Sequence, residues 1–219
     1  MALARLLQLA SPALPVGAYS YSQGLESAIA EGVVGDAQTA ARWIGDVLEF
    51  SLARMEAPLF LRCCGAWAEE DFPSVQALNA QFLASRESAE LRAETLQMGY
   101  SLNRLLSDLG LVRLPFDEPS FPAAFSYAAT AWGLAPSDAL LAYLWSWAEN
   151  QVMAALKAVP LGQTAGQRML LDLGARLPEL VDRAVRDARA AGLPPGNFAP
   201  GFALRAARHE TLYSRLFRS

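Results

Sequence analysis

Apolar residues recur at helical spacing along almost the whole chain. In residues 85–109 they return every three or four positions, and charged and polar residues occupy the other side. Few segments alternate with the period of two that a half-buried strand requires, and none does so convincingly. The pattern predicts an all-α protein, a single-domain helical bundle of about eight to ten helices.

Glycine and proline separate the expected helices. Asp36 is a favourable N-cap for one of them, Ser137 for another, and Pro58 is expected to kink or restart the helix that contains it. Gly174 is expected to separate two helices near the C-terminal end. We predict helices over residues 2–10, 19–30, 37–68, 74–84, 85–109, 125–132, 138–159, 163–173, 178–190 and 202–219.

Two segments lack helical periodicity. Residues 111–122 (LVRLPFDEPSFP) are interrupted by proline and form the expected seam between two halves of the fold. Residues 192–201 (GLPPGNFAPG) are expected to be a flexible or extended connector. We therefore predict one domain over residues 1–219, in which residues 192–219 supply the connector and a mobile C-terminal docking segment.

The composition favours a protein that binds other proteins. Hydrophobic residues make up 53% of the chain and charged residues 18%, so part of the apolar surface is expected to contact a partner. Lys157 is the only lysine, and the arginines that supply the other basic groups suit interface contacts. Residues 1–156 hold 8 basic and 17 acidic residues, whereas residues 157–219 hold 10 and 5. This asymmetry predicts a docking surface at the basic end, and a solvated basic end is the alternative.

The sequence lacks the motifs of independent chemistry. Lys157 is followed by Ala158, so there is no Walker A loop, and a single histidine cannot supply an HExxH or Cys/His metal site. Cys63 and Cys64 are adjacent, which suits a reducing cytoplasm better than a structural disulfide. His209 follows the connector and is expected to lack the rigid support of a catalytic base. We expect no signal peptide, membrane span, catalytic residue, cofactor or metal site within one chain.

Residues 11–28 (SPALPVGAYSYSQGLESA) combine a rigid turn with an unusual polar set. Two prolines and Gly17 fix the turn, and from Tyr19 onward the pattern is helical. Gly24 would cost roughly 1 kcal/mol inside that helix. The segment is either a loop that caps a core helix or a polar turn directed at a partner. In the second case, the candidate partner-binding residues are Tyr19, Ser20, Tyr21, Gln23 and Glu26.

Arg86 and Glu87 begin the long helix predicted over residues 85–109. Neighbouring residues on a helix do not face each other, so the two side chains are expected to contact different partners. The alternative is an exposed first turn in which the helix dipole favours Glu87.

Residues 159–168 (VPLGQTAGQR) end one helix and begin another. The free backbone donors at a helix start, with Gln163, Gln167 and Arg168, are candidates for contact with a partner or an anion. A turn between two buried helices, with the glutamines bonded to local backbone, is the alternative.

The last stretch, residues 205–219 (RAARHETLYSRLFRS), is rich in arginine. If it is helical, four arginines form one basic stripe beside apolar and aromatic residues, which is typical of a helix that docks in a partner's groove. Packing on its own domain is the alternative. The candidate partner-binding residues here are His209, Glu210, Tyr213, Arg215, Leu216, Phe217 and Arg218.

Four stretches resemble the urease accessory protein UreF family. They are SPALPVGAYSYSQGLE at residues 11–26, SRES at 85–88, PLGQTAGQ at 160–167 and HETLYSRLFRS at 209–219. The chain departs from the family pattern at Ala18 and Tyr19, where Gly and Phe are usual. It also departs at Ala165, where the family pattern has Asp, so no carboxylate is present at that turn.

The resemblance implies a cytoplasmic, all-helical, non-enzymatic factor in the maturation of urease, a nickel enzyme. It implies a homodimer that bridges the nickel-carrying GTPase UreG and UreD, called UreH in some organisms. The assembled complex would modulate the GTPase and deliver nickel to apo-urease. Docking on UreD then falls on residues 209–218, which become ordered in that complex. The opening signature and the glutamine turn are expected to contact the GTPase or to help form a passage for nickel.

Two other classes are compatible with the residues alone. One is a helical enzyme with a polar pocket around Glu26 and Gln163, in which Glu26 acts as the base. The other is a regulator that binds nucleic acid through the C-terminal arginines, although a net charge of −4 counts against it. The basic stripe is short for a membrane-surface helix, so neither nucleic acid nor a membrane is an expected partner.

Overall fold

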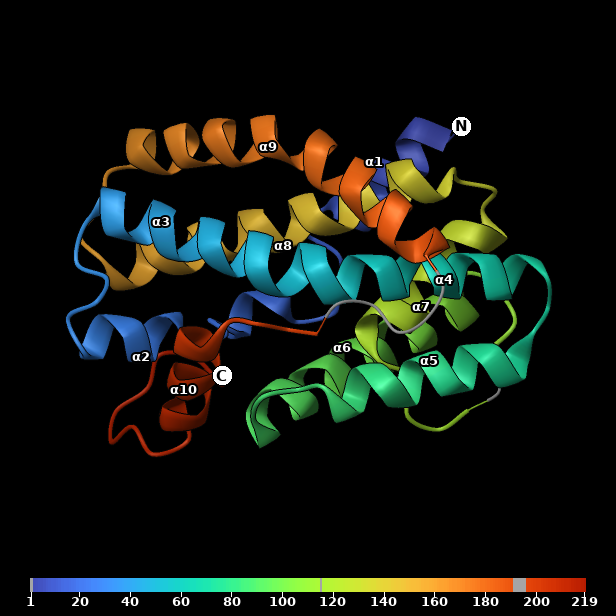
Figure 1. Ribbon diagram of the computed structural model, residues 1–219, viewed down its shortest axis with the longest axis horizontal. Coiled ribbons are helices and arrows are strands. Elements are labelled where there is room, and N and C mark those ends of the chain that lie inside the picture. The colour runs from blue at the N-terminus through green and yellow to red at the C-terminus, as the bar shows by residue number, and fades with distance from the viewer. Residues whose placement is uncertain (1, 115, 191–195) are drawn as a thin grey trace.

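The computed structural model describes residues 2–114, 116–190 and 196–219, and in these ranges all regular structure is helical. The described ranges form one compact domain (Figure 1), which confirms the all-α class. The elements are α1 Ala2–Ala10, η1 Ala18–Ser20, α2 Leu25–Ala30, α3 Ala37–Val47, η2 Leu48–Glu56, α4 Ala57–Ala68, α5 Phe72–Ala84, α6 Ala89–Asp108, α7 Phe121–Ala131, α8 Pro136–Ala158, α9 Gln163–Arg189 and α10 Pro200–His209.

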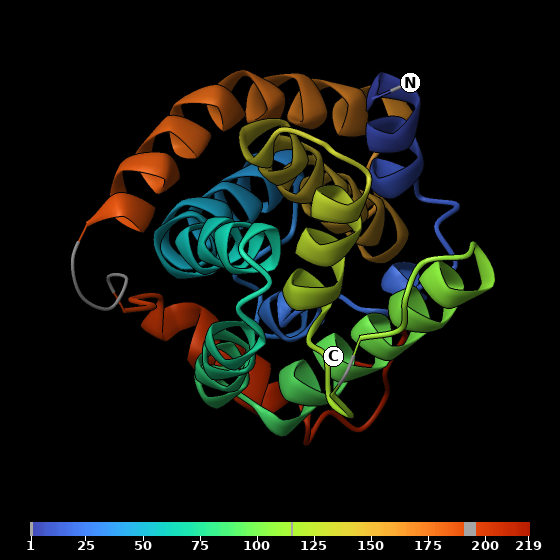
Figure 2. The same cartoon turned by 90° about the vertical axis from the view of Figure 1, so that its right-hand side faces the viewer.

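Helix α8 lies inside the bundle, and α9 curves around the outside (Figure 2). Helix α8 packs against α9, α1, α3, α4 and α7, as its almost continuous apolar surface predicts. Tyr143 of α8 joins Phe60, Phe121 and Phe125 in a core cluster with ring centroids between 5.2 and 5.9 Å apart. Across the described ranges, no helix combines the length and apolar character needed to cross a bilayer.

Helix α9 runs from Gln163 to Arg189 without a break, so the predicted division at Gly174 is wrong. Pro178 lies inside α9 and costs about 3 kcal/mol in a helix interior. Leu173, Leu177 and Leu180 are buried where α9 packs on α8 and α4. Burial of each leucine side chain stabilises the folded state by about 1.5–3 kcal/mol, so the three together exceed the cost of the proline. Gly174 allows close packing, because a Cβ there would lie 3.1 Å from the Trp145 ring.

The helix predicted from Tyr19 begins only at Leu25. Tyr21 is extended, and Gln23 and Gly24 have positive φ angles of 51° and 76°. Left-handed residues do not occur inside a right-handed helix, so residues 21–24, between η1 and α2, form a turn instead. Gly24 is the N-cap of α2, and a Cβ there would approach the Ala206 backbone nitrogen to 3.1 Å.

One predicted cap is confirmed, one is wrong, and one predicted helix start is shifted. Asp36 caps α3, because its carboxylate accepts a 2.8 Å hydrogen bond from the Thr39 backbone nitrogen. Helix α6 begins after Ser88, whose hydroxyl caps it, and not at residue 85. Helix α8 begins at Pro136, since the fixed φ of proline suits a first helical turn, and Ser137 is not its N-cap.

Two further predictions bear on breaks in the fold. Pro58 lies in the first turn of α4, so of the two expected outcomes, a kink or a restart, the structure shows the restart, and a π-helical stretch, η2, joins α3 to α4. The proposed seam joins α6 to α7, and these helices pack on each other, so it does not divide the fold. Pro115 in the seam and residues 191–195 around the connector lie outside the described residues.

Candidate functional site

The C-terminal segment, defined here as residues 196–219, folds back onto its own domain. Its helix α10 packs on α2 and α6 (Figure 1), and Phe202, Ala206 and Phe217 are buried. The helix ends at His209, so the predicted single basic stripe that continues to Arg218 does not form. The structure therefore gives no support for a mobile tail and shows the alternative, packing on the same chain.

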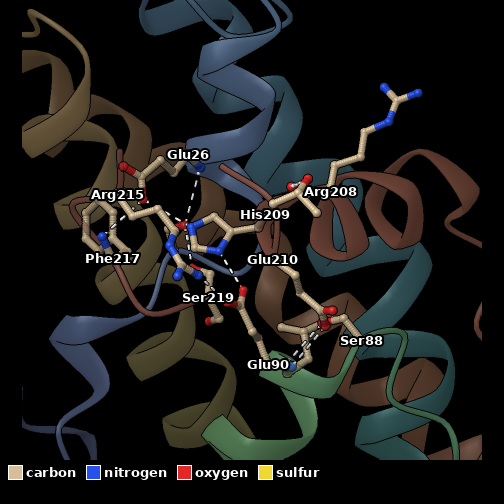
Figure 3. A network of polar contacts seen from close by, with 12 residues as sticks. Glu26, Ser88, Glu90, Arg208, His209, Glu210, Arg215, Phe217 and Ser219 are labelled. Atoms are coloured by element: carbon tan, nitrogen blue, oxygen red, sulfur yellow. Dashed lines mark hydrogen bonds and ion pairs between the residues drawn. The ribbon is translucent and has the colours of Figure 1, made fainter. Parts of the chain in front are cut away.

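His209 is the centre of this contact and is fully buried. Its Nδ1 lies 2.6 Å from an oxygen of Glu90 on α6, and its Nε2 lies 3.1 Å from an oxygen of Glu26 on α2 (Figure 3). The expectation that His209 lacks rigid support is thus wrong. Because both ring nitrogens are engaged by carboxylates, the imidazole has no free nitrogen with which to accept a proton from a substrate.

Glu26 also holds the chain that follows α10. Its two oxygens accept hydrogen bonds from the backbone nitrogens of Leu216 at 2.6 Å and Phe217 at 3.0 Å. Arg215 donates to Glu90 at 2.5 Å (Figure 3). A charged acceptor strengthens such bonds, and these contacts replace the helical bonding that the sequence predicted for residues 210–219.

The last residue reaches the turn in the opening segment. The Ser219 carbonyl oxygen accepts from the Ser22 and Gln23 backbone nitrogens at 2.8 and 3.0 Å, and from the Ser22 hydroxyl at 2.6 Å. The Ser219 hydroxyl donates to Glu94 at 2.7 Å, and Gln23 donates to the other Glu94 oxygen at 2.6 Å. Desolvation raises the pKa of the Glu94 carboxyl to about 7.

Other contacts join the C-terminal segment to the start of α6. The Glu210 carboxylate accepts from the Ala89 backbone nitrogen at 2.8 Å, where the helix dipole favours a negative charge. Asn197 donates to Glu87, and burial raises the pKa of the Glu87 carboxyl. Arg86 instead pairs with Glu56 at 3.3 Å. Both residues precede α6 and both side chains are held within the chain, so the alternative of an exposed first helical turn is wrong. Their contact with partner proteins stays a prediction.

Replacing Glu26 by alanine is expected to loosen residues 209–219, because it removes the acceptor of two backbone amides and the carboxylate beside His209 Nε2. The Leu216 and Phe217 amides lose a charged acceptor, which corresponds to roughly 10-fold faster hydrogen exchange. Exchange of individual amides, followed by NMR, measures the effect. The control is Glu31→Ala, which removes ion pairs to Arg205 and Arg208 but no acceptor of these amides. Unchanged exchange at Leu216 and Phe217 in Glu26→Ala would contradict the prediction.

Comparison with known proteins agrees with the motifs. A family model described as UreF matches residues 34–174. Curated proteins named urease accessory protein UreF align over almost the whole chain. The one from an Azoarcus species is 59% identical and the alignment covers 99% of this chain and 95% of the relative. Those from Dechloromonas aromatica and Methylobacillus flagellatus are 55% and 49% identical, and each covers 99% of this chain and 97% of the relative. This chain belongs to the UreF family.

The UreF family model ends inside α9, whereas the curated UreF relatives align over nearly all of the C-terminal segment as well. Most of the contact between the opening turn and the C-terminal segment therefore lies within sequence that aligns with these relatives. Of the predicted site residues, the UreF fold brings together Ser20, Tyr21, Gln23, Glu26, His209, Glu210, Arg215, Leu216, Phe217 and Arg218.

The glutamine turn of this UreF-family chain lies elsewhere. Gln163, Gln167 and Arg168 are exposed on the first turns of α9. Figure 1 shows that α3 lies between α9 and α2. Among the described residues, no hydrogen bond or ion pair joins these three side chains to the C-terminal segment or to the opening turn. The enzyme alternative required a pocket shared by Glu26 and Gln163, and neither residue lines the cavity between the opening segment, α6 and α8 or the hollow beside Tyr19 and Leu216.

Sequence reasoning missed the partners that hold the tail. Glu90 and Glu94 were assigned only to the polar side of the long helix, and Ser22 and Ser219 were not singled out. Glu90 and Glu94 are four residues apart on α6, so both carboxylates lie on one face of that helix. This spacing becomes a recognisable signal once a cationic or hydroxyl partner is known. Nothing in the sequence indicates that residues 209–219 are that partner.

Metal-binding potential is limited in the described part of the chain. It contains no group of three or more histidine, cysteine, aspartate or glutamate side chains arranged to hold a metal ion. Burial raises the pKa of the Cys63 and Cys64 thiols to about 12, so both stay protonated and supply no thiolate ligand at neutral pH.

Proposed function

We propose that this protein is a non-enzymatic, cytoplasmic urease accessory factor that works as a homodimer. It bridges the nickel-carrying GTPase UreG and UreD, called UreH in some organisms. The resulting complex modulates the GTPase and delivers nickel, as cargo, to apo-urease. The single observation that carries the proposal is membership of the UreF family over 99% of the chain. The enclosed positions of His209 and Glu26 support it, because neither side chain is free to act on a substrate.

The exposed side of the C-terminal segment is our candidate for the UreD contact. Tyr213 is fully exposed and Leu216 is 72% exposed, although the backbone of Leu216 is held by Glu26. An aromatic and an aliphatic side chain presented by an ordered backbone lose little conformational entropy on binding, which suits interface anchors.

The GTPase contact is assigned to a second surface. Gln163, Gln167 and Arg168 present exposed donors at the start of α9. Tyr19 instead borders the C-terminal segment, because it lines one hollow with Lys157, Leu216 and Phe217. Separate surfaces for two partners are what a bridging role requires, because both partners must bind at once.

The proposal is tested by reconstituting urease activation. Apo-urease, UreD, UreG, GTP and nickel are combined with and without the purified chain, and nickel incorporation and urea hydrolysis are measured. We expect activation to depend on the chain and the chain alone to hydrolyse nothing. Equal nickel incorporation without the chain overturns the proposal.

The docking surface is tested by the double variant Tyr213→Ala, Leu216→Ala. Loss of two anchors is expected to weaken UreD binding about 30-fold, measured by calorimetry or surface plasmon resonance. Thermal stability should change little, because both side chains are exposed. Truncation before Phe202 is a poor substitute, since it also removes the buried Phe202, His209 and Phe217 and so exposes the core.

The matched control for this test is Leu3→Ala, Leu7→Ala, which removes two exposed leucines from α1. We expect it to bind UreD like the wild type. Wild-type affinity in the Tyr213/Leu216 variant, or equal losses in both double variants, rejects docking through the tail.

A further inference from the structure

An aromatic surface, defined here by Trp67, Phe72, Phe116 and Tyr127, lies where α4 leads into α5. The Trp67 ring centroid is 6.0 Å from that of Phe72, 6.3 Å from that of Phe116 and 5.0 Å from that of Tyr127. Trp67 is buried, whereas Phe72 is 46% exposed and Phe116 is partly exposed. Figure 1 shows the link between α4 and α5 at the end of the molecule opposite to α2. The aromatic surface is therefore separate from the two partner surfaces proposed above.

Hydrogen bonds hold the rings of this surface in place. The Trp67 Nε1 donates to the Ala123 carbonyl oxygen at 3.2 Å, and the Tyr127 hydroxyl donates to the Val112 carbonyl oxygen at 2.7 Å. The second bond ties the loop that carries Phe116 to α7. Aromatic rings on an ordered backbone lose little conformational entropy when a partner binds, so the surface is preorganised for contact.

Carboxylates border the exposed rings. Five of them lie within three positions of Phe72 or Phe116 in the sequence: Glu69, Glu70, Asp71, Asp117 and Glu118. Glu118 pairs with Arg92 at 3.3 Å. The other four form no ion pair among the described residues, so the surface stays negative even with Arg113 on the same loop. Charge complementarity therefore favours a cationic partner.

The chain itself shows which cation binds a ring and a carboxylate together. Arg205 lies over the Trp43 ring at 5.8 Å and pairs with Glu31 at 3.4 Å. In the part of the chain that the structure describes, no lysine or arginine lies over Phe72 or Phe116. The aromatic surface thus has the ring and the carboxylates of this arrangement without its arginine.

A second arginine in the fold repeats the arrangement. Arg86 lies over the Phe82 ring at 4.0 Å and pairs with Glu56 at 3.3 Å. A guanidinium suits both contacts, because its flat face stacks on a ring while its N–H groups pair with a carboxylate. The ammonium of lysine is more strongly hydrated and lacks the planar fork, so arginine is the better match.

We propose that the aromatic surface is a docking site for an arginine-bearing segment of a partner protein. A guanidinium of the partner stacks on the exposed Phe72 ring and pairs with the carboxylates beside it. Single ion pairs and cation–π contacts on a surface are weak, so the partner binds through more than one residue. This site is additional to the two partner surfaces of the proposed assembly role.

The probe is the pentapeptide acetyl-Ala-Arg-Ala-Arg-Ala-amide, compared with versions in which lysine or the neutral isostere citrulline replaces both arginines. Each peptide is titrated into the full-length, 15N-labelled protein, and NMR follows the amides of residues 67–72 and 116–118 and the Trp67 indole N–H. We expect saturable shifts at these signals with the arginine peptide. The lysine peptide should bind about 5-fold more weakly and the citrulline peptide about 10-fold more weakly.

Two variants test the ring and the charges separately. Phe72→Ala is expected to weaken binding of the arginine peptide about 5-fold, and the double variant Glu70→Gln, Asp117→Asn about 10-fold. The matched controls are Phe198→Ala, which removes a ring that is 77% exposed before α10, and Glu179→Gln on α9. Both controls should bind like the wild type. Thermal melts establish that each variant is folded before titration.

Four results overturn the proposal. The first is the absence of a saturable shift at the aromatic surface, including the case in which shifts are spread over the whole acidic protein. The second is binding of the citrulline peptide as tightly as the arginine peptide. The third is wild-type affinity in both folded test variants. The fourth is a shift of the same amides on dilution without peptide, because a second copy of the chain would then cover the surface.

Discussion

The Gly99→Ala variant is expected to lose about 3 kcal/mol of unfolding free energy, a large part of what a domain of this size has. Gly99 lies in the middle of α6, and a Cβ there would be 2.0 Å from the Pro119 carbonyl oxygen and 2.7 Å from the Ser120 carbonyl carbon. Both neighbours are backbone, so neither can rotate away as a side chain would. The methyl group can be accommodated only if the segment before α7 moves off α6.

That segment has little freedom to move. The Ser120 and Phe121 backbone nitrogens donate to Asn79 at 2.8 Å and Thr95 at 3.0 Å, and Asn79 also donates to the Glu118 carbonyl oxygen at 2.9 Å. Displacing the segment breaks these buried bonds and also shifts α7 and its aromatic residues. The predicted loss therefore comes from overpacking together with broken hydrogen bonds.

The control for this prediction is Gly65→Ala, the same substitution in the interior of another helix. A Cβ at Gly65 meets nothing within 4 Å, so the variant should be about 0.5–1 kcal/mol more stable than the wild type. Urea unfolding followed by circular dichroism measures both variants. A Gly99→Ala protein as stable as the wild type would show that α6 and the segment before α7 are not in such close contact.

The success of the sequence analysis depended on how local each signal was. The all-α class, α1 and the Asp36 cap follow from helical periodicity and from side-chain chemistry within a few residues. Pro178 and Gly174 are equally clear local signals for a helix break, but α9 continues through both. The burial of its leucines stabilises the unbroken helix, and Gly174 allows it to pack closely against the Trp145 ring. Gly99 carried no local signal, since only the distant Pro119 explains it.

The candidate site shows the same limit. The polar residues of 19–26 and 209–218 were recognisable as two unusual groups, and the structure brings most of them together. What the sequence did not show is that each group is the other's partner. Glu26 and His209 are 183 positions apart, and their pairing depends on the paths of α2 and α10. The left-handed turn at Gln23 and Gly24 was hidden because Tyr21, Leu25 and Ile29 happen to recur at helical spacing.

The stability of the protein is expected to depend on pH through Glu94. Desolvation raises the pKa of this carboxyl from 4.5 to about 7 in the folded state. The folded protein therefore binds the Glu94 proton more tightly than the unfolded chain does. Between those two pH values the folded state holds more protons, so stability falls as pH rises. At about 1.4 kcal/mol per pKa unit, the loss approaches about 3 kcal/mol and is complete above pH 7.

Glu94→Gln should remove this dependence and leave the local hydrogen bonds in place. The new carbonyl can accept from Gln23, and the new amide can donate to the Ser219 hydroxyl, as the neutral acid does. At pH 8 the variant is expected to be about 3 kcal/mol more stable than the wild type, and near pH 4.5 the two should be similar. The difference between their unfolding free energies isolates Glu94 from other groups, such as Glu87, whose pKa is also raised by burial.

Urea unfolding at a series of pH values from 4.5 to 8 measures this difference. The control is Glu179→Gln, which changes a carboxylate that is 82% exposed, and its curve should run parallel to that of the wild type. A wild-type curve parallel to that of Glu94→Gln would mean that Glu94 stays ionised in the fold. The Ser219 hydroxyl and Gln23 would then be holding a charged carboxylate, and the chain end would be attached as firmly at pH 8 as at pH 5. If instead the prediction holds, ionisation of Glu94 above pH 7 weakens the contact between Ser219 and the opening turn. The desolvated Glu94 carboxylate then has only two neutral donors, Gln23 and the Ser219 hydroxyl.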